Sequence, residues 1–89
     1  MKYQLEDYVL VEKWQGGVVI FDVNSYDFLE FNEVGSLIVE EIEKGKEVEE
    51  IVDSIVGIYE VETEQAKADV LAFCRELEDN GIICKVKGN

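Results

Sequence analysis

The sequence contains no histidine and no proline, and it has only eight lysine and arginine residues against 21 aspartate and glutamate residues. Without histidine, a Ser-His-Asp triad, a His-ligated zinc site and the commonest general base are all excluded. The net charge of −13 argues against nucleic-acid binding, which depends on lysine and arginine neutralising phosphates. Anionic membrane surfaces are disfavoured for the same reason.

Signals for export or membrane insertion are also missing. Residues 1–7 carry acids where a signal peptide needs an apolar run, and no stretch approaches the roughly 18 apolar residues of a membrane span. Cys74 and Cys84 are too few for a disulfide scaffold, so we expect reduced thiols, with a disulfide between them as the alternative. We predict one cytoplasmic domain over residues 1–89, because a chain this short cannot divide its core.

The first third of the chain is typical of β-structure. Three runs of apolar, β-branched and aromatic residues are separated by pairs of small or polar residues that suit tight turns. We therefore predict a three-stranded antiparallel sheet. The predicted strands cover residues 8–12, 18–23 and 26–31, and the predicted turns are Gly16-Gly17 and Asn24-Ser25.

The last of these strands is expected to have two different faces, because successive side chains of a strand point to opposite sides. We expect Leu29 and Phe31 to meet the core, on the face that Asp27 shares. The opposite face consists of Tyr26, Phe28 and Glu30. This strand therefore places two aromatic side chains away from the core.

Beyond Asn32 the apolar residues recur about every 3.6 residues and no longer every second residue, which predicts amphipathic helices. The first helix is capped by Asn32 and ends at Gly45, with acids such as Glu41 on its outer side. The second carries one apolar stripe from Val48 to Tyr59. Eleven of the 21 acids fall within residues 33–64, so the negative charge is concentrated in the middle third of the chain, which contains these two helices.

The third helix begins with Thr63 as its cap and ends at Asn80-Gly81. Its apolar arc is wider than one core-facing stripe requires, so we expect it to contact the core and something else. Residues 82–86 read as a short C-terminal strand or tail. The predicted fold is α+β and winged helix-turn-helix-like, with a three-stranded antiparallel sheet followed by three helices (βββααα).

We find no catalytic or metal-binding constellation in the sequence, and we predict no metal and no cofactor. Paired carboxylates such as Glu40-Glu41 fall opposite the apolar stripes, where a solvated face is expected. The sequence has no calcium loop and no phosphate-binding glycine loop. A DNA-recognition helix would need basic residues, whereas residues 47–59 carry four acids and no base.

Ser36 leaves one alternative function open. It stands near the start of a predicted helix in a small, very acidic protein, as does the serine of acyl carrier proteins that accepts phosphopantetheine. A carrier would have an acid directly before that serine, whereas Gly35 precedes Ser36. An acyl or peptidyl carrier modified at Ser36 is therefore the alternative to a binding protein.

The surplus aromatic and apolar surface favours binding. If the strand at 26–31 lies at a sheet edge beside the third helix, the two form a groove that accepts an extended peptide as an added strand. In the competing interpretation, Tyr26 and Phe28 pack under residues 81–86 or against the first strand. The open edge can also pair with a second copy of the chain to form a homodimer.

Three segments, in order and at the right intervals, carry a family resemblance over about residues 8–84. They are Tyr26 through Gly35, Gly45 followed by Val48-Glu49-Glu50-Ile51-Val52, and Asp69-Val70-x-x-Phe73-Cys74-x-x-Leu77-x-x-x-Gly81-Ile82-Ile83. This pattern resembles the PqqD family, small RiPP recognition elements that bind the leader regions of ribosomally made, post-translationally modified peptides. The chain departs from it at Glu47, where Ser or Thr is common, and at Cys74, where Leu is common.

The resemblance implies a non-catalytic, free-standing adaptor, a peptide chaperone of natural product biosynthesis. It would bind a precursor leader peptide as an added strand beside residues 26–31 and against the third helix. It would then deliver the precursor to a maturation enzyme, either a leader peptidase of a lasso-peptide pathway or a radical SAM enzyme. The acidic middle helices suggest a basic docking surface on that enzyme.

Residue by residue, the resemblance implies two sets of peptide-binding residues. The strand edge is supplied by Tyr26, Asp27, Phe28, Leu29, Glu30 and Phe31. The helical wall is supplied by Ala66, Asp69, Val70 and Phe73. Asp69 would pair with a basic or hydroxyl-bearing leader side chain, unless it is an ordinary exposed helix acid.

Overall fold

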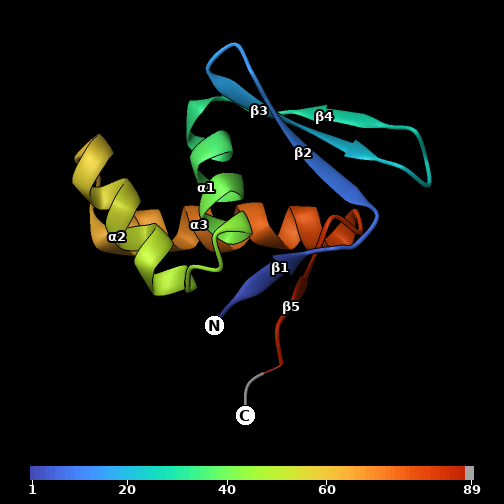
Figure 1. Cartoon of the computed structure of the whole chain (residues 1–89). Coiled ribbons are helices and arrows are strands. Elements are labelled where there is room, and N and C mark those ends of the chain that lie inside the picture. The colour runs from blue at the N-terminus through green and yellow to red at the C-terminus, as the bar shows by residue number, and fades with distance from the viewer. Residues whose placement is uncertain (88–89) are drawn as a thin grey trace.

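The computed structural model describes residues 1–87, which form five strands and three helices (Figure 1). In chain order they are β1 (Tyr3–Leu5), β2 (Val9–Trp14), β3 (Gly17–Asp22), β4 (Phe28–Glu30), α1 (Glu33–Glu43), α2 (Val48–Tyr59), α3 (Thr63–Asp79) and β5 (Ile83–Lys85). The predicted α+β class, with a three-stranded antiparallel sheet and three helices, is confirmed. No helix within residues 1–87 is both long and apolar enough to cross a membrane.

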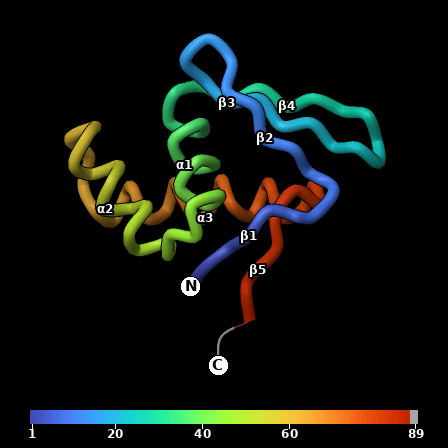
Figure 2. The backbone as a smooth tube through the Cα atoms, viewed as in Figure 1, coloured from blue at the N-terminus to red at the C-terminus, as the bar shows by residue number. Residues whose placement is uncertain are grey.

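The strands form two separate sheets. One is the predicted antiparallel sheet, in the order β2-β3-β4. The other consists of β1 and β5, which pair antiparallel close to both chain ends (Figure 2). The C-terminal strand was among the predictions, but β1 was not. The three residues of β1 are too few to show a recognisable alternation of apolar and polar side chains, and the partner strand of β1 lies at the far end of the sequence.

Both predicted turns are shifted. The turn between β2 and β3 consists of Gln15 and Gly16, with φ values of 48° and 82°, so Gly17 already belongs to β3. The connection to β4 is longer than the two residues predicted, because the Asp22 carboxylate accepts hydrogen bonds from the Asn24 and Ser25 amides at 2.8 and 3.1 Å. The chain therefore reverses over more residues and enters β4 later.

The residue that takes the left-handed conformation in this connection is Tyr26, with φ of 63°. Positive φ is unusual for a bulky side chain. As a result, β4 begins at Phe28 and covers only part of the predicted strand at 26–31. Tyr26 and Asp27 belong to the connection and not to the strand.

The helix boundaries follow the predicted signals closely. The Asn32 carboxamide accepts a hydrogen bond from the Gly35 amide at 2.8 Å, which confirms the predicted cap of α1. The cap of α3 is Glu62, one residue before the predicted Thr63. Glu41, predicted on the outer side of α1, is buried instead, and the Ser54 hydroxyl of α2 donates to its carboxylate at 2.8 Å.

The core lies between the inner face of the three-stranded sheet, the three helices and the β1–β5 pair. Its largest fully buried side chains come from all of these parts: Ile20, Ile51, Ile83, Val18, Val39, Val70 and Cys74. Both cysteines are free thiols. Burial raises the pKa of the Cys74 thiol to about 11, so this side chain behaves as a small apolar residue at neutral pH.

Ser36 connects α1 to the sheet. Its side chain is only 3% exposed, accepts a hydrogen bond from the Val18 amide at 2.9 Å, and donates one to the Phe31 carbonyl at 3.3 Å. These bonds hold the start of β3 and the residue after β4 against the helix. They also contradict the carrier alternative, because attachment of phosphopantetheine requires an accessible hydroxyl.

Gly35 allows α1, β4 and α3 to meet closely. A Cβ atom at this position would lie 3.2 Å from the Cβ of Phe31 and 3.2 Å from the ring of Phe73. The two phenylalanine rings meet edge to face, with their centroids 5.6 Å apart. The end of β4 is thereby fixed to the middle of α3 through a position that has no side chain.

We predict that Ser36→Ala destabilises the fold by about 1–3 kcal/mol, because the buried Val18 amide is left without an acceptor. Urea denaturation followed by circular dichroism measures this loss. The matched control is Ser25→Ala in the exposed connection before β4, where we expect a change within about 0.5 kcal/mol. Equal effects of the two substitutions would contradict the role given to Ser36.

We predict that Gly35→Ala is net destabilising, by about 1 kcal/mol. Overpacking typically costs about 1–3 kcal/mol, and the intrinsic helix preference of alanine offsets part of it. Gly57→Ala in α2 is the control, because a Cβ there meets nothing within 4 Å. It should stabilise by about 0.5–1 kcal/mol. Opposite signs in urea denaturation are expected; a stabilising Gly35→Ala would show that Phe31 and Phe73 tolerate the methyl group.

Candidate functional site

The outer edge of β4 is open. The Asp22 amide donates to the Asp27 carbonyl at 3.0 Å, and the Phe31 amide donates to the Val18 carbonyl at 3.3 Å. Because backbone groups alternate in direction along a strand, the N–H and C=O groups of Phe28 and Glu30 point away from β3. Within residues 1–87 no strand pairs with this side of β4.

A hollow of about 510 Å³ lies beyond the end of β4 and is formed by all three helices. We call it the Phe73 hollow. The α3 residues that line it are Asp69 and Phe73. The remaining lining residues are Asn32, Val34, Gly35 and Ile38 at the start of α1, and Ile55, Tyr59 and Val61 in and after α2.

A second hollow, of about 440 Å³, lies beside the beginning of β4, and we call it the Leu29 hollow. Its lining residues are Ile20, Asp22, Ser25, Asp27, Phe28, Leu29, Asn80 and Ile82. Asp69 and Phe73 of α3 line the first hollow, and Asn80, the C-cap of the same helix, lines the second, about 16 Å further along at 1.5 Å per residue. Phe28 and Leu29 of β4 line the second hollow, and Phe31, the residue after β4, contacts Phe73 of the first.

The rim of the Phe73 hollow includes the Asp69 carboxylate, and Glu33 stands next to the lining residue Tyr59. The Tyr59 hydroxyl donates to the Glu33 carboxylate at 3.1 Å, and the Gln65 side-chain amide donates to the Asp69 carboxylate at 2.8 Å. Desolvation and, after it, the bond to Glu33 raise the pKa of Tyr59, so its hydroxyl stays protonated at neutral pH. The rim thus presents carboxylate acceptors above an apolar floor.

The structure brings most of the predicted strand residues to this region. Asp27, Phe28 and Leu29 line the Leu29 hollow, and the backbone of Glu30 faces the open edge. Phe31 is half-buried against Phe73. Of the residues predicted for the helical wall, Asp69 and Phe73 line the Phe73 hollow.

Three predicted residues are placed differently. Ala66 and Val70 are 1% and 0% exposed, so they belong to the core and support the wall from inside without lining it. Tyr26 is 76% exposed and lies in the connection before β4, where it contributes no edge group. Ala66 and Val70 therefore lie inside the core and Tyr26 lies outside the strand, and a part for these three residues in peptide binding stays a prediction.

Several lining residues were not predicted as site residues, above all those of α1 and α2. Val34 and Gly35 stood within the family-like segment, which is the one signal that pointed to them. Tyr59 and Ile55 were assigned to the core stripe of α2, and in the structure they also border the hollow. Only the packing of three helices brings these residues together.

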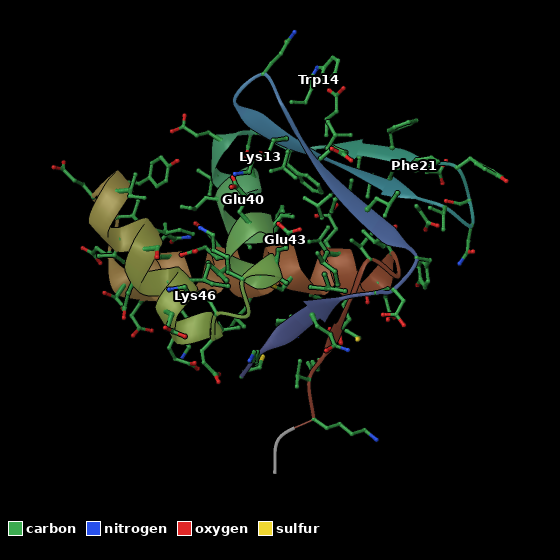
Figure 3. All side chains as sticks on the ribbon, in the orientation of Figure 1. Lys13, Trp14, Phe21, Glu40, Glu43 and Lys46 are labelled. Atoms are coloured by element: carbon green, nitrogen blue, oxygen red, sulfur yellow. The ribbon has the colours of Figure 1, made fainter. Side chains whose placement is uncertain are left out.

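The outer face of the three-stranded sheet is a second exposed surface. Leu10, Phe21 and Phe28 stand in one row across β2, β3 and β4, and the rings of Phe21 and Phe28 stack at 4.7 Å. Leu10 is 50% and Phe28 is 68% exposed. Figure 3 shows Phe21 on this sheet and Trp14 at the end of the hairpin, pointing away from the helices. The interpretation in which Tyr26 and Phe28 pack under residues 81–86 or against the first predicted strand is wrong, since both side chains are largely exposed.

Next to this row lies an acidic one, in which Val19 of β3 is flanked by Glu12 of β2 and Glu30 of β4. Lys13, which alternates to the other side of β2, forms an ion pair with Glu40 of α1 at 3.4 Å (Figure 3). Among the described residues, no group of three Asp, Glu or Cys side chains is placed to hold a metal ion. The β4 edge with its two hollows is one exposed surface of the molecule, and the outer sheet face is the other. Together they offer backbone hydrogen-bonding groups, apolar hollows and carboxylates, which suit the binding of an extended chain.

Comparisons with known proteins agree with this geometry. Two solved structures resemble the chain along nearly its whole length: a lasso peptide synthetase B1 complexed with the leader peptide, and TbiB1 in complex with the TbiA(β) leader peptide. The first has a TM-score of 0.88 at 25% identity and covers 96% of this chain and 100% of its own. The second has a TM-score of 0.89 at 27% identity and covers 96% and 99%. No curated protein sequence matches the chain.

A family model gives the assignment. The model described as coenzyme PQQ synthesis protein D (PqqD) matches residues 17–83, from the first residue of β3 to the first residue of β5. This stretch contains all three helices, the open edge of β4 and the residues that line both hollows. The chain belongs to the PqqD family.

Proposed function

We propose that this chain is a non-catalytic recognition domain that binds the leader region of a ribosomally synthesised precursor peptide. The leader adds as a strand to the open edge of β4 and lies against α3. The observation that carries this proposal is the open edge of β4, with the Leu29 hollow at the residues where the strand begins and the Phe73 hollow at the residues that follow it. Both solved structures that resemble the chain contain a leader peptide, which supports the same reading.

Strand addition explains how one short site can hold different peptides. The N–H and C=O groups of Phe28 and Glu30 supply sequence-independent affinity, since every peptide carries matching groups. Specificity comes from side chains that enter the Phe73 hollow and the Leu29 hollow. Their apolar walls gain free energy by removing leader side chains from water.

We also propose that the bound precursor is delivered to a maturation enzyme, either a leader peptidase of a lasso-peptide pathway or a radical SAM enzyme. The outer sheet face with Leu10, Phe21 and Phe28 supports a contact of this kind, because exposed apolar side chains that adjoin one another can form an interaction site. The acidic row beside it favours a basic partner surface. We place the chain in the cytoplasm, where free thiols such as Cys74 and Cys84 persist.

Two further features stay part of this proposal. The chain acts as one recognition domain, and the short connection between α2 and α3, together with the β2–β3 hairpin, suits a winged helix-turn-helix-like arrangement. The edge of β4 is also the place where two copies of the chain could pair. The leader competes for that edge, so we expect a homodimer of this kind to be dissolved by leader binding.

We predict that Glu30→Pro lowers leader affinity about tenfold, because proline removes an N–H donor from the open edge of β4. Proline is tolerated at sheet edges, and the N–H lost is not one that pairs with β3. Calorimetric titration with a synthetic leader from a precursor gene beside the gene for this chain measures the effect.

The matched control for this experiment is Lys13→Pro. The N–H of Lys13 points to the open edge of β2, on the opposite side of the sheet, where no leader is expected. Lys13→Pro should leave leader affinity unchanged. Equal losses in the two variants, with both folded by circular dichroism, would show that the leader does not add to β4.

We predict that Leu10→Ser leaves leader binding unchanged but weakens the contact with the maturation enzyme by about tenfold. Leu10 lies on β2, away from both hollows, and its exposed side chain contributes only to the outer sheet face. Co-purification with the enzyme, together with its rate of leader processing, gives the readout. Ile58→Ser, another exposed apolar residue but on α2, should have no effect; a similar loss there would argue against the sheet face.

A further inference from the structure

We propose that the Phe73 hollow receives a lysine or arginine side chain of the leader, with the aliphatic stem on the apolar floor and the cationic end at the Asp69 carboxylate. This inference rests on the proposed leader binding and adds the chemistry of one leader position. It makes Asp69 a specificity-determining residue.

The floor of the hollow suits a long unbranched stem. It is formed by Val34, Ile38, Ile55, Val61 and the ring of Phe73, which come from four separate segments of the chain. Lysine and arginine side chains bury their methylene groups along apolar surface and keep the charged end at the rim. The Phe73 ring adds a face that attracts a cation.

The carboxylates at the rim have no cationic partner in the part of the chain that the structure describes. Asp69 and Glu33 receive hydrogen bonds only from neutral donors, Gln65 and Tyr59. The ion pairs within residues 1–87 lie elsewhere: they join the N-terminal amine to Glu47 and Glu49, and Lys13 to Glu40. The rim therefore carries two negative charges that the protein does not neutralise.

The basic residues of α3 face other parts of the surface. Lys67 lines a shallow hollow with Val48 on the α2 side, and Arg75 lines another with Leu71. Neither lines the Phe73 hollow. A cation at the rim must come from the ligand, and in a chain of net charge −13 the surrounding field favours it.

A purely apolar leader side chain fits this hollow less well. It would cover the floor, but it would also remove water from Asp69 and Glu33 without replacing the lost hydrogen bonds, which is costly for charged groups. A basic side chain covers the same floor and supplies N–H donors to the Asp69 carboxylate. A tyrosine side chain supplies one donor and no charge, which makes it the competing outcome.

A double-mutant cycle between leader and protein tests this assignment. The probe is the synthetic leader from the neighbouring precursor gene, with each Lys and Arg replaced in turn by Met, which keeps an apolar stem and removes the charge. Each peptide is titrated by calorimetry against the wild type, Asp69→Asn and Glu64→Gln. Glu64 lies on α3 five residues before Asp69 and does not line the hollow. Its substitution by Gln removes one negative charge, as Asp69→Asn does.

We expect one leader position at which Lys or Arg→Met lowers affinity about tenfold for the wild type and for Glu64→Gln, but less than twofold for Asp69→Asn. A leader that binds well and shows no such coupling at any Lys or Arg, or that contains neither, overturns the inference and leaves leader binding intact. Coupling at a tyrosine instead overturns the cationic assignment. A leader that does not bind the wild type at all refutes the proposed function together with this inference.

Discussion

The contact of Phe31 with Gly35 and Phe73 is the constraint on which the site depends. Phe31 follows β4 directly, and its ring contacts the ring of Phe73 on α3. Its backbone carbonyl accepts a hydrogen bond from the hydroxyl of Ser36 on α1. One residue thus fixes the strand edge relative to two helices. Phe31 and Phe73 can approach α1 this closely only because Gly35 has no side chain. A Cβ atom at Gly35 would lie 3.2 Å from the Cβ of Phe31 and 3.2 Å from the ring of Phe73. The distance between the open edge and the helical wall is therefore set by packing and not by loops.

An open edge strand is a liability in a folded protein, because it can pair with any extended chain. In this protein the exposed stretch is only the three residues of β4, and acids stand at Asp27 and Glu30. Short length and negative charge both limit pairing with another copy of the same acidic chain. The same negative charge does not repel a basic ligand from the edge. The net charge of −13 can thus protect the edge and select for what occupies it.

The sequence was sufficient for the helices and for the class of the fold. The cap at Asn32 and the stripe of α2 are local signals that depend on residues close together in the chain, and the structure confirms both. β1 was missed because its three residues are held in place by β5, which lies almost 80 residues further along. The burial of Glu41 could not be foreseen either, since it depends on Ser54 of the neighbouring helix.

The candidate site was only partly predictable for the same reason. The periodicity of α3 indicates that Ala66, Val70 and Phe73 are apolar, but it does not separate those that face the core from those that face a groove. Ala66 and Val70 are buried, whereas Phe73 is partly exposed, with its ring packed against Gly35 and Phe31. The position of Tyr26 likewise depends on the Asp22 carboxylate, which binds two amides and lengthens the connection before β4.

The two exposed surfaces of the molecule meet at Phe28. Its backbone N–H and C=O belong to the open edge of β4, while its side chain stacks on Phe21 in the outer face of the sheet. A peptide added to β4 becomes a fourth strand and extends that outer face with its own alternate side chains. An enzyme that contacts the outer face beside Phe28 then meets protein and leader on one continuous surface. In the proposed complex, the strand that binds the leader therefore also carries part of the surface that the enzyme contacts.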